Sequence, residues 1–143
     1  MSIKAFMQPP VEAETKEVII SARFADEKGK PQPFVIRAIS QETNEGLRKQ
    51  ASHPIKRNGV IVGEDIDTTK YGQLLVLACT VEPDFRDKEL CDYYKTLDPA
   101  EVPSRMLGAG EYAKLVKEIN KLNGFISQDN SNALDELEEE AKN

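Results

Sequence analysis

Residues 67–83 read DTTKYGQLLVLACTVEP, and this stretch decides the fold because it holds the most apolar helical pattern of the chain. Asp67 is a favourable N-cap residue, and apolar side chains recur after it at positions 71, 74, 75, 78 and 79, the spacing of one helix face. Val76 and Leu77 widen this face beyond a single stripe. The pattern predicts a central helix with neighbours on more than one side, which Pro83 should end.

Downstream of this helix, shorter helical segments are expected. Residues 87–94 (DKELCDYY) predict a short helix, and residues 98–101 (DPAE) carry the Asp and Pro that favour a second helix start, with Pro103 keeping that element short. Residues 111–122 predict the last amphipathic helix, and Gly124 stands where a left-handed C-cap would be. The C-terminal half of the body is therefore expected to be helical.

Upstream, the spacing changes from helical to alternating. Residues 15–24 and 34–38 place apolar side chains at even positions, and residues 25–33 (ADEKGKPQP) are typical of a turn, with Gly29 able to adopt a positive φ. Ser40 is a good N-cap for a helix running towards Ser52, before Pro54. Asn58-Gly59 between apolar residues predicts a tight hairpin, either a second β-ribbon or a mobile flap.

These elements predict an α+β fold, in which an N-terminal antiparallel β-hairpin packs against about five short α-helices. One domain is expected over residues 15–125, preceded by a flexible arm over residues 1–14, whose Ile3, Phe6 and Met7 are free to pack on the body. Residues 126–143 are expected to form an acidic, disordered tail, or else a helix that docks when a partner arrives. The predicted core residues are Leu74, Leu75, Ala78, Leu115, Val116 and Ile119.

Composition and charge narrow the classes of partner. The chain has 143 residues and a net charge of −6, of which residues 126–143 carry −5, so the body is nearly neutral and has no basic cluster for nucleic acid. No apolar run reaches the roughly 18 residues of a membrane span. Cys79 and Cys91 are expected to be buried free thiols. We expect a soluble intracellular protein that binds neither nucleic acid nor membrane.

Patterns that carry catalytic or metal chemistry are missing. The single histidine, His53, lies in a polar turn with no nucleophile elbow, and one His with two distant Cys does not make a zinc site. We therefore predict no catalytic residues, no metal and no cofactor, and instead a protein that binds proteins through the apolar faces of its helices. The candidate groove residues, each of which is also suited to the core, are Tyr71, Tyr93, Tyr94, Met106, Leu107 and Tyr112.

The order of several short motifs resembles one family. These are residues 34–37 (FVIR), 57–60 (RNGV), 67–71 (DTTKY), 81–84 (VEPD), 87–90 (DKEL), 106–112 (MLGAGEY) and 119–125 (INKLNGF). Together they resemble the XkdN-type tail assembly chaperones of tailed phages and prophages. The resemblance spans residues 15–125, most of the chain.

This resemblance implies a chaperone that coats the helical tape measure protein in the host bacterial cytoplasm and is absent from the mature virion. It also implies a longer product of a programmed ribosomal frameshift, whose added domain recruits tail tube protein. Residues 141–143 (AKN) allow the codons GCA-AAA-AAC, which contain the slippery heptamer A-AAA-AAC. The sequence leaves homo-oligomerisation open. The alternative function is a small cytoplasmic adaptor or regulator unrelated to tail assembly.

Overall fold

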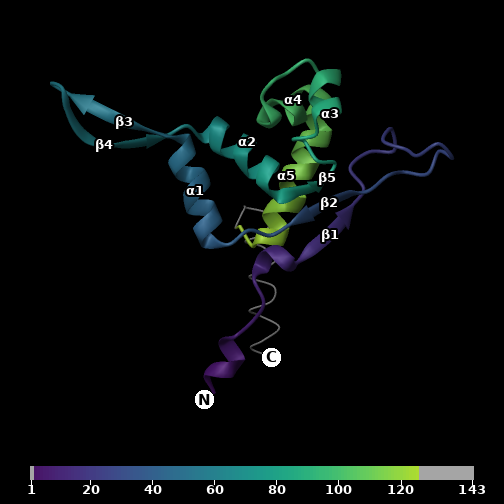
Figure 1. The fold of residues 1–143 in the computed structure, drawn as a ribbon, viewed down its shortest axis with the longest axis horizontal. Helices are drawn as coiled ribbons and strands as arrows, with labels where there is room; N and C mark the ends of the chain where they lie inside the picture. Colours follow the sequence, from purple (N-terminus) through teal and green to yellow (C-terminus); the bar gives the residue numbers. More distant parts are fainter. Residues whose placement is uncertain (1, 126–143) are drawn as a thin grey trace, which may run out of the picture.

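The computed structural model describes residues 2–125, and its fold combines two antiparallel β-sheets with five α-helices over that part of the chain (Figure 1). This confirms the predicted α+β class. In chain order the elements are η1 (Ile3–Phe6), η2 (Val11–Ala13), β1 (Thr15–Val18), β2 (Phe34–Arg37), α1 (Gln41–Ala51), β3 (Ser52–Arg57), β4 (Val60–Ile66), α2 (Thr68–Cys79), β5 (Thr80–Glu82), α3 (Lys88–Tyr93), η3 (Pro99–Glu101), α4 (Val102–Met106) and α5 (Ala109–Asn123).

The first sheet has three strands where the sequence predicted a hairpin of two. Its order is β1-β2-β5, and all neighbours are antiparallel. The third strand arises because α2 ends at Cys79 and not near Pro83, so the prediction for the end of this helix was wrong. Thr80 and Val81 are β-branched, and a residue before proline favours extended backbone, so residues 80–82 add to the free edge of β2.

The first strand is shorter than the alternation predicted. β1 pairs with β2 only from Thr15 opposite Arg37 to Val18 opposite Phe34, although residues 15–24 alternate. Ile20 remains buried beyond the end of β1, and the chain then turns so that Arg23 reaches Glu111 at the start of α5. The pairing thus ends where β2 begins at Phe34, directly after Pro33, which has no backbone N–H to donate.

The helix starts follow the predicted capping chemistry. The side chains of Ser40, Asp67 and Asp87 accept hydrogen bonds from backbone N–H groups in the first turns of α1, α2 and α3. Gly124 adopts a left-handed φ of 73° and ends α5, as expected. The element that begins at Asp98 is short, as expected: it is the 3-10 helix η3, Pro99–Glu101, and Pro103 lies in the first turn of the next helix, α4.

The hairpin at Asn58-Gly59 is a two-stranded β-ribbon, one of its two predicted forms. Asn58 and Gly59 have φ of 52° and 77°, the positive values that a tight two-residue hairpin turn requires. β3 and β4 pair from Ser52 opposite Ile66 to Arg57 opposite Val60, with a bulge beyond Ile55. Figure 1 shows this ribbon projecting from the corner where α1 meets α2, away from the sheet and the other helices.

The core lies between the three-stranded sheet and helices α2, α4 and α5. Leu75, Ala78, Leu115 and Ile119 are buried, as predicted, while Leu74 and Val116 are only partly buried at its margin. Phe85, which the sequence analysis did not include, is among the most deeply buried side chains. Cys79 and Cys91 are buried free thiols, which confirms that prediction.

The N-terminal arm, residues 2–14, lies outside the core. Ile3, Phe6 and Met7 of the N-terminal arm are exposed and do not pack on the body. The arm is joined to α1 at Glu12, whose carboxylate accepts a hydrogen bond from Ser40 N at 2.8 Å. The predicted acidic tail, residues 126–143, lies outside the described residues.

Candidate functional site

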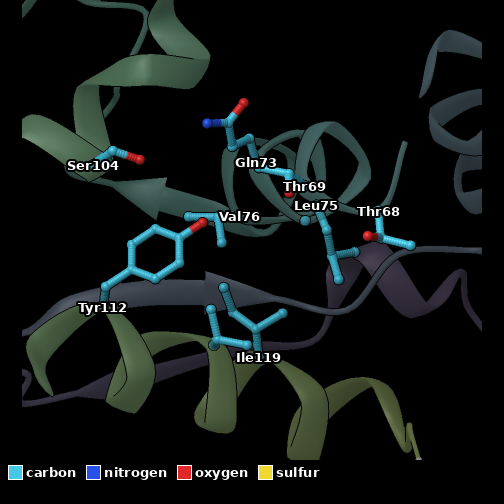
Figure 2. Close-up of a pocket in the computed structure, with 10 residues that line it drawn as sticks. Thr68, Thr69, Gln73, Leu75, Val76, Ser104, Tyr112 and Ile119 are labelled. Atoms are coloured by element: carbon cyan, nitrogen blue, oxygen red, sulfur yellow. The ribbon is translucent and has the colours of Figure 1, made fainter. Parts of the chain in front are cut away.

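The first candidate site is an apolar groove of about 340 Å³ between α2, α4 and α5 (Figure 2). Leu75, Val76, Val116 and Ile119 form its apolar lining, and Gly72 of α2 also lines it. A Cβ added at Gly72 would meet no atom within 4 Å. The groove therefore has open space at this position of α2.

Polar side chains stand around this apolar lining. Thr68, Thr69 and Gln73 come from α2, and Ser104 comes from α4 across the groove (Figure 2). None of these side chains is ionisable, so the groove has neither an acid–base pair nor a nucleophile with an adjacent base. An apolar channel with a neutral polar rim suits the apolar face of a helix.

Tyr112 is the predicted groove residue that lies in this site. It projects from α5 towards Val76 in Figure 2 and is half-buried, and burial raises the pKa of its hydroxyl. Within residues 2–125 this hydroxyl has no hydrogen-bond partner. The side chain therefore offers a partner both an aromatic face and a free polar group.

A second apolar concavity, of about 400 Å³, lies between the β1–β2 loop, β5 and α4. Phe24 and Phe34 line it, with their ring centroids 5.4 Å apart, and Met106 lines it from α4. Met106 is nevertheless a buried member of the core. This concavity is thus an extension of the core towards the surface.

An ion pair beside this concavity holds the β1–β2 loop against α5. Arg23 donates hydrogen bonds to both carboxylate oxygens of Glu111, at 2.7–3.1 Å. The Arg23 guanidinium, and after it the Gly108 backbone N–H, hold the pKa of Glu111 down at about 2. The same guanidinium lies 4.3 Å from the centroid of the Phe24 ring.

A third concavity, of about 450 Å³, runs beside α3. Pro83, Leu90 and Tyr93 supply its apolar part, and the carboxylates of Asp84, Asp87 and Glu89 also line it. Tyr93 is 76% exposed and packs edge-on against Tyr94, with a centroid distance of 4.9 Å. This surface is both apolar and acidic.

The remaining candidate residues lie elsewhere. Tyr71 is half-buried against the core, and its hydroxyl donates a hydrogen bond to Asn44 Oδ1. Leu107 is buried, and Tyr94 is half-buried behind Tyr93. The six residues predicted as one groove are therefore distributed over three concavities and the core.

The sequence analysis missed the residues that make the first groove. Leu75, Val116 and Ile119 were assigned to the core alone, and Gly72 was not considered. A glycine within an otherwise strong helix pattern was the available signal, because such a glycine weakens the helix and often marks a packing or functional need.

The described residues contain neither a metal-binding cluster nor a helix suited to crossing a membrane. Within residues 2–125, no three His, Cys, Asp or Glu side chains are grouped so as to hold a metal ion. His53 lies on the exposed ribbon, with Nε2 3.7 Å from Asp65 Oδ2. None of the described helices is both long enough and apolar enough to cross a membrane.

Comparison with known proteins identifies the family. The sequence profile of the phage XkdN-like tail assembly chaperone proteins matches residues 3–142. The chain belongs to this family. The family predicted from the order of the short motifs is thereby confirmed.

Individual relatives agree with this assignment. The phage-like element PBSX protein XkdN of Bacillus subtilis (strain 168) is 38% identical over 136 residues, which cover 93% of this chain and 87% of the relative. The uncharacterized protein YqbN of the same strain matches with the same identity and coverage. A crystal structure of YqbN aligns with a TM-score of 0.70 and 31% identity, covering 88% of this tail assembly chaperone and 97% of the YqbN chain.

Proposed function

We propose that this member of the tail assembly chaperone family binds the tape measure protein and keeps it soluble in the host bacterial cytoplasm while the tail is built. The groove between α2, α4 and α5 is the observation that carries the proposal. An unassembled tape measure protein exposes apolar helical faces, and such faces aggregate unless another surface covers them. An apolar groove with an uncharged rim covers them without requiring one exact sequence.

The contact residues of this proposal follow from the geometry of the groove. Leu75, Val76 and Val116 contact the apolar face of the docked helix, and Tyr112 contributes its ring and free hydroxyl. Tyr93 and Tyr94, on α3 and at its end, form a second contact surface for the same long partner. Several modest contacts along one rod give avidity while each contact remains reversible.

Gly72 allows this proposal to be tested by a matched pair of variants. Gly72→Phe fills the groove, whereas Gly72→Ala adds only a methyl group to open space. Each variant, and the wild type, is co-expressed with the tape measure protein, and the soluble, co-purifying fraction of that protein is measured. We expect full rescue by the wild type and Gly72→Ala, and loss of rescue with Gly72→Phe, while circular dichroism shows that both variants are folded.

Two outcomes would contradict the proposal. If the wild-type chain does not increase the soluble fraction of the tape measure protein, the partner is wrong. If folded Gly72→Phe rescues as well as Gly72→Ala, the groove is not the contact. The family match favours the chaperone function over the adaptor unrelated to tail assembly that the sequence alone left open.

We also propose that a longer frameshifted product recruits tail tube subunits, and that neither product remains in the finished virion. The support for the frameshift is the C-terminal sequence Ala141-Lys142-Asn143, whose codons allow a slippery heptamer. Reading these three codons is the first test, because codons other than GCA-AAA-AAC remove the slip site. Mass spectrometry of assembled tails tests the absence of both products from the virion.

A further inference from the structure

The β3–β4 ribbon carries an exposed apolar face that no described residue covers. Arg57 pairs with Val60, and Ile55 lies two residues before Arg57 on β3, so Ile55, Arg57 and Val60 lie on the same side of the ribbon. Val60 is 62% exposed and Ile55 is 41% exposed. Exposed apolar side chains gathered on one projecting element are typical of an interaction surface.

The α3 concavity is apolar and acidic, which complements a ribbon face that carries apolar side chains and an arginine. Pro83, Leu90 and Tyr93 form its apolar part, and its lining contains the three carboxylates of Asp84, Asp87 and Glu89 but no basic side chain. Of the cations nearby in sequence, Lys88 is paired with Asp92 at 3.9 Å, and Arg86 and Lys95 do not line the concavity. Leu97, which follows α3 by four residues, is fully exposed.

We infer that the apolar face of the ribbon docks into the α3 concavity of a second copy of this chain. Valine and isoleucine side chains would cover Pro83, Leu90 and Tyr93, while the Arg57 guanidinium would meet the carboxylate rim. The ribbon and α3 lie on opposite sides of α2 in Figure 1, so one copy does not fill its own concavity with its own ribbon.

This contact joins two different surfaces, so it is heterologous. Each docked copy still presents a free ribbon at one end and a free α3 concavity at the other, and addition of copies continues unless a ring closes. The inference concerns the chain alone: Tyr93 contacts a second copy until the tape measure protein binds and takes that place. Its test therefore needs no tape measure protein, and its failure leaves the proposed function untouched.

Two ribbon variants make a matched pair. Arg57→Glu reverses the charge on the apolar face, whereas Lys56→Glu makes the same change in net charge on the opposite face. Sedimentation velocity over a concentration series measures the dissociation constant of full-length wild type and variants. We expect Arg57→Glu to weaken self-association by about tenfold or more, and Lys56→Glu to leave it within about twofold.

Reversal of a rim charge completes the experiment. Glu89 makes no side-chain hydrogen bond within residues 2–125, so Glu89→Arg changes the rim without removing an internal contact. We expect E89R alone to weaken self-association as R57E does, because each variant brings like charges together. An equimolar mixture of the two variants should restore association between unlike copies, because the unchanged Arg57 ribbon of E89R meets the unchanged acidic concavity of R57E.

Three results would overturn the inference. If the wild type stays monomeric at all concentrations, the chain does not self-associate. If K56E and R57E weaken self-association equally, the contact is not made by the face that carries Arg57. Failure of the mixture to associate, with both variants shown to be folded by circular dichroism, removes the pairing of ribbon and α3 concavity.

Discussion

The buried hydroxyl of Thr80 is expected to reduce the stability of this chaperone. Thr80 follows α2 at the start of β5, and within residues 2–125 its Oγ1 is the one buried side-chain polar atom without a hydrogen-bond partner. A buried polar group left unpaired costs about 1–3 kcal/mol, and valine has nearly the same shape without the hydroxyl. We therefore expect Thr80→Val to raise the free energy of unfolding by about 1–2 kcal/mol.

Thr96 supplies the matched control, because it is also buried but its hydroxyl is satisfied. Its Oγ1 donates to Glu101 Oε2 at 2.9 Å and accepts from Asp98 N at 3.1 Å. Thr96→Val removes both hydrogen bonds, so the same substitution should lower the free energy of unfolding by about 1–2 kcal/mol. The two variants are predicted to differ in sign.

Urea denaturation followed by far-UV circular dichroism measures both effects. The midpoint should rise for Thr80→Val and fall for Thr96→Val, with the slope m unchanged in each case. Thermal midpoints should move in the same directions by about 4 °C for each kcal/mol at this chain length. A neutral or destabilising Thr80→Val would refute the reasoning, because it would show that the hydroxyl has a partner such as a buried water.

Three further predictions concern a carboxylate, a thiol and a pair of glycines. Arg23 holds the pKa of Glu111 at about 2, below its usual 4.5. The stability that this carboxylate adds is therefore complete above pH 4.5 and is lost as the pH falls through about 2. Urea titrations at several pH values should show that Glu111→Gln loses less stability on acidification than the wild type does. Burial raises the pKa of the Cys79 thiol to about 11. Alkylation of this thiol by iodoacetamide near neutral pH should therefore be slow and should accelerate only when urea unfolds the protein. Fast alkylation of the folded chain would contradict this prediction. Gly124→Ala should destabilise the protein by about 1 kcal/mol because φ is 73° at this position, whereas Gly72→Ala, in an open helical position, should stabilise it by about 0.5–1 kcal/mol. Urea denaturation measures both effects. Equal effects would contradict the assignment of these differences to backbone conformation.

The candidate site was only partly predictable. The apolar character of α2 and α5 follows from residue spacing, and it correctly indicated that Leu75 and Ile119 face other elements. Spacing cannot say whether two apolar faces close completely or leave a groove, because that depends on how the helices approach each other. Here the space beside Gly72 stays open, and Tyr112 enters the lining from a helix some 40 residues away in the chain.

Local chemistry explains what the sequence determined by itself. The caps at Ser40 and Asp67, the turn at Asn58-Gly59 and the end of α5 at Gly124 each depend on hydrogen bonds or φ preferences within a few residues, so neighbouring residues are sufficient to predict them.

Only the tertiary structure decided how far each strand extends and whether a groove remains between the helices. Residues 80–82 became a strand because the edge of β2, some 45 residues earlier, offered unpaired backbone groups next to Ile36. β1 pairs only as far as Val18, and five residues later Arg23 reaches Glu111 on α5. These outcomes depend on partners that are distant in the chain, and folding brings such partners together only when the whole core forms.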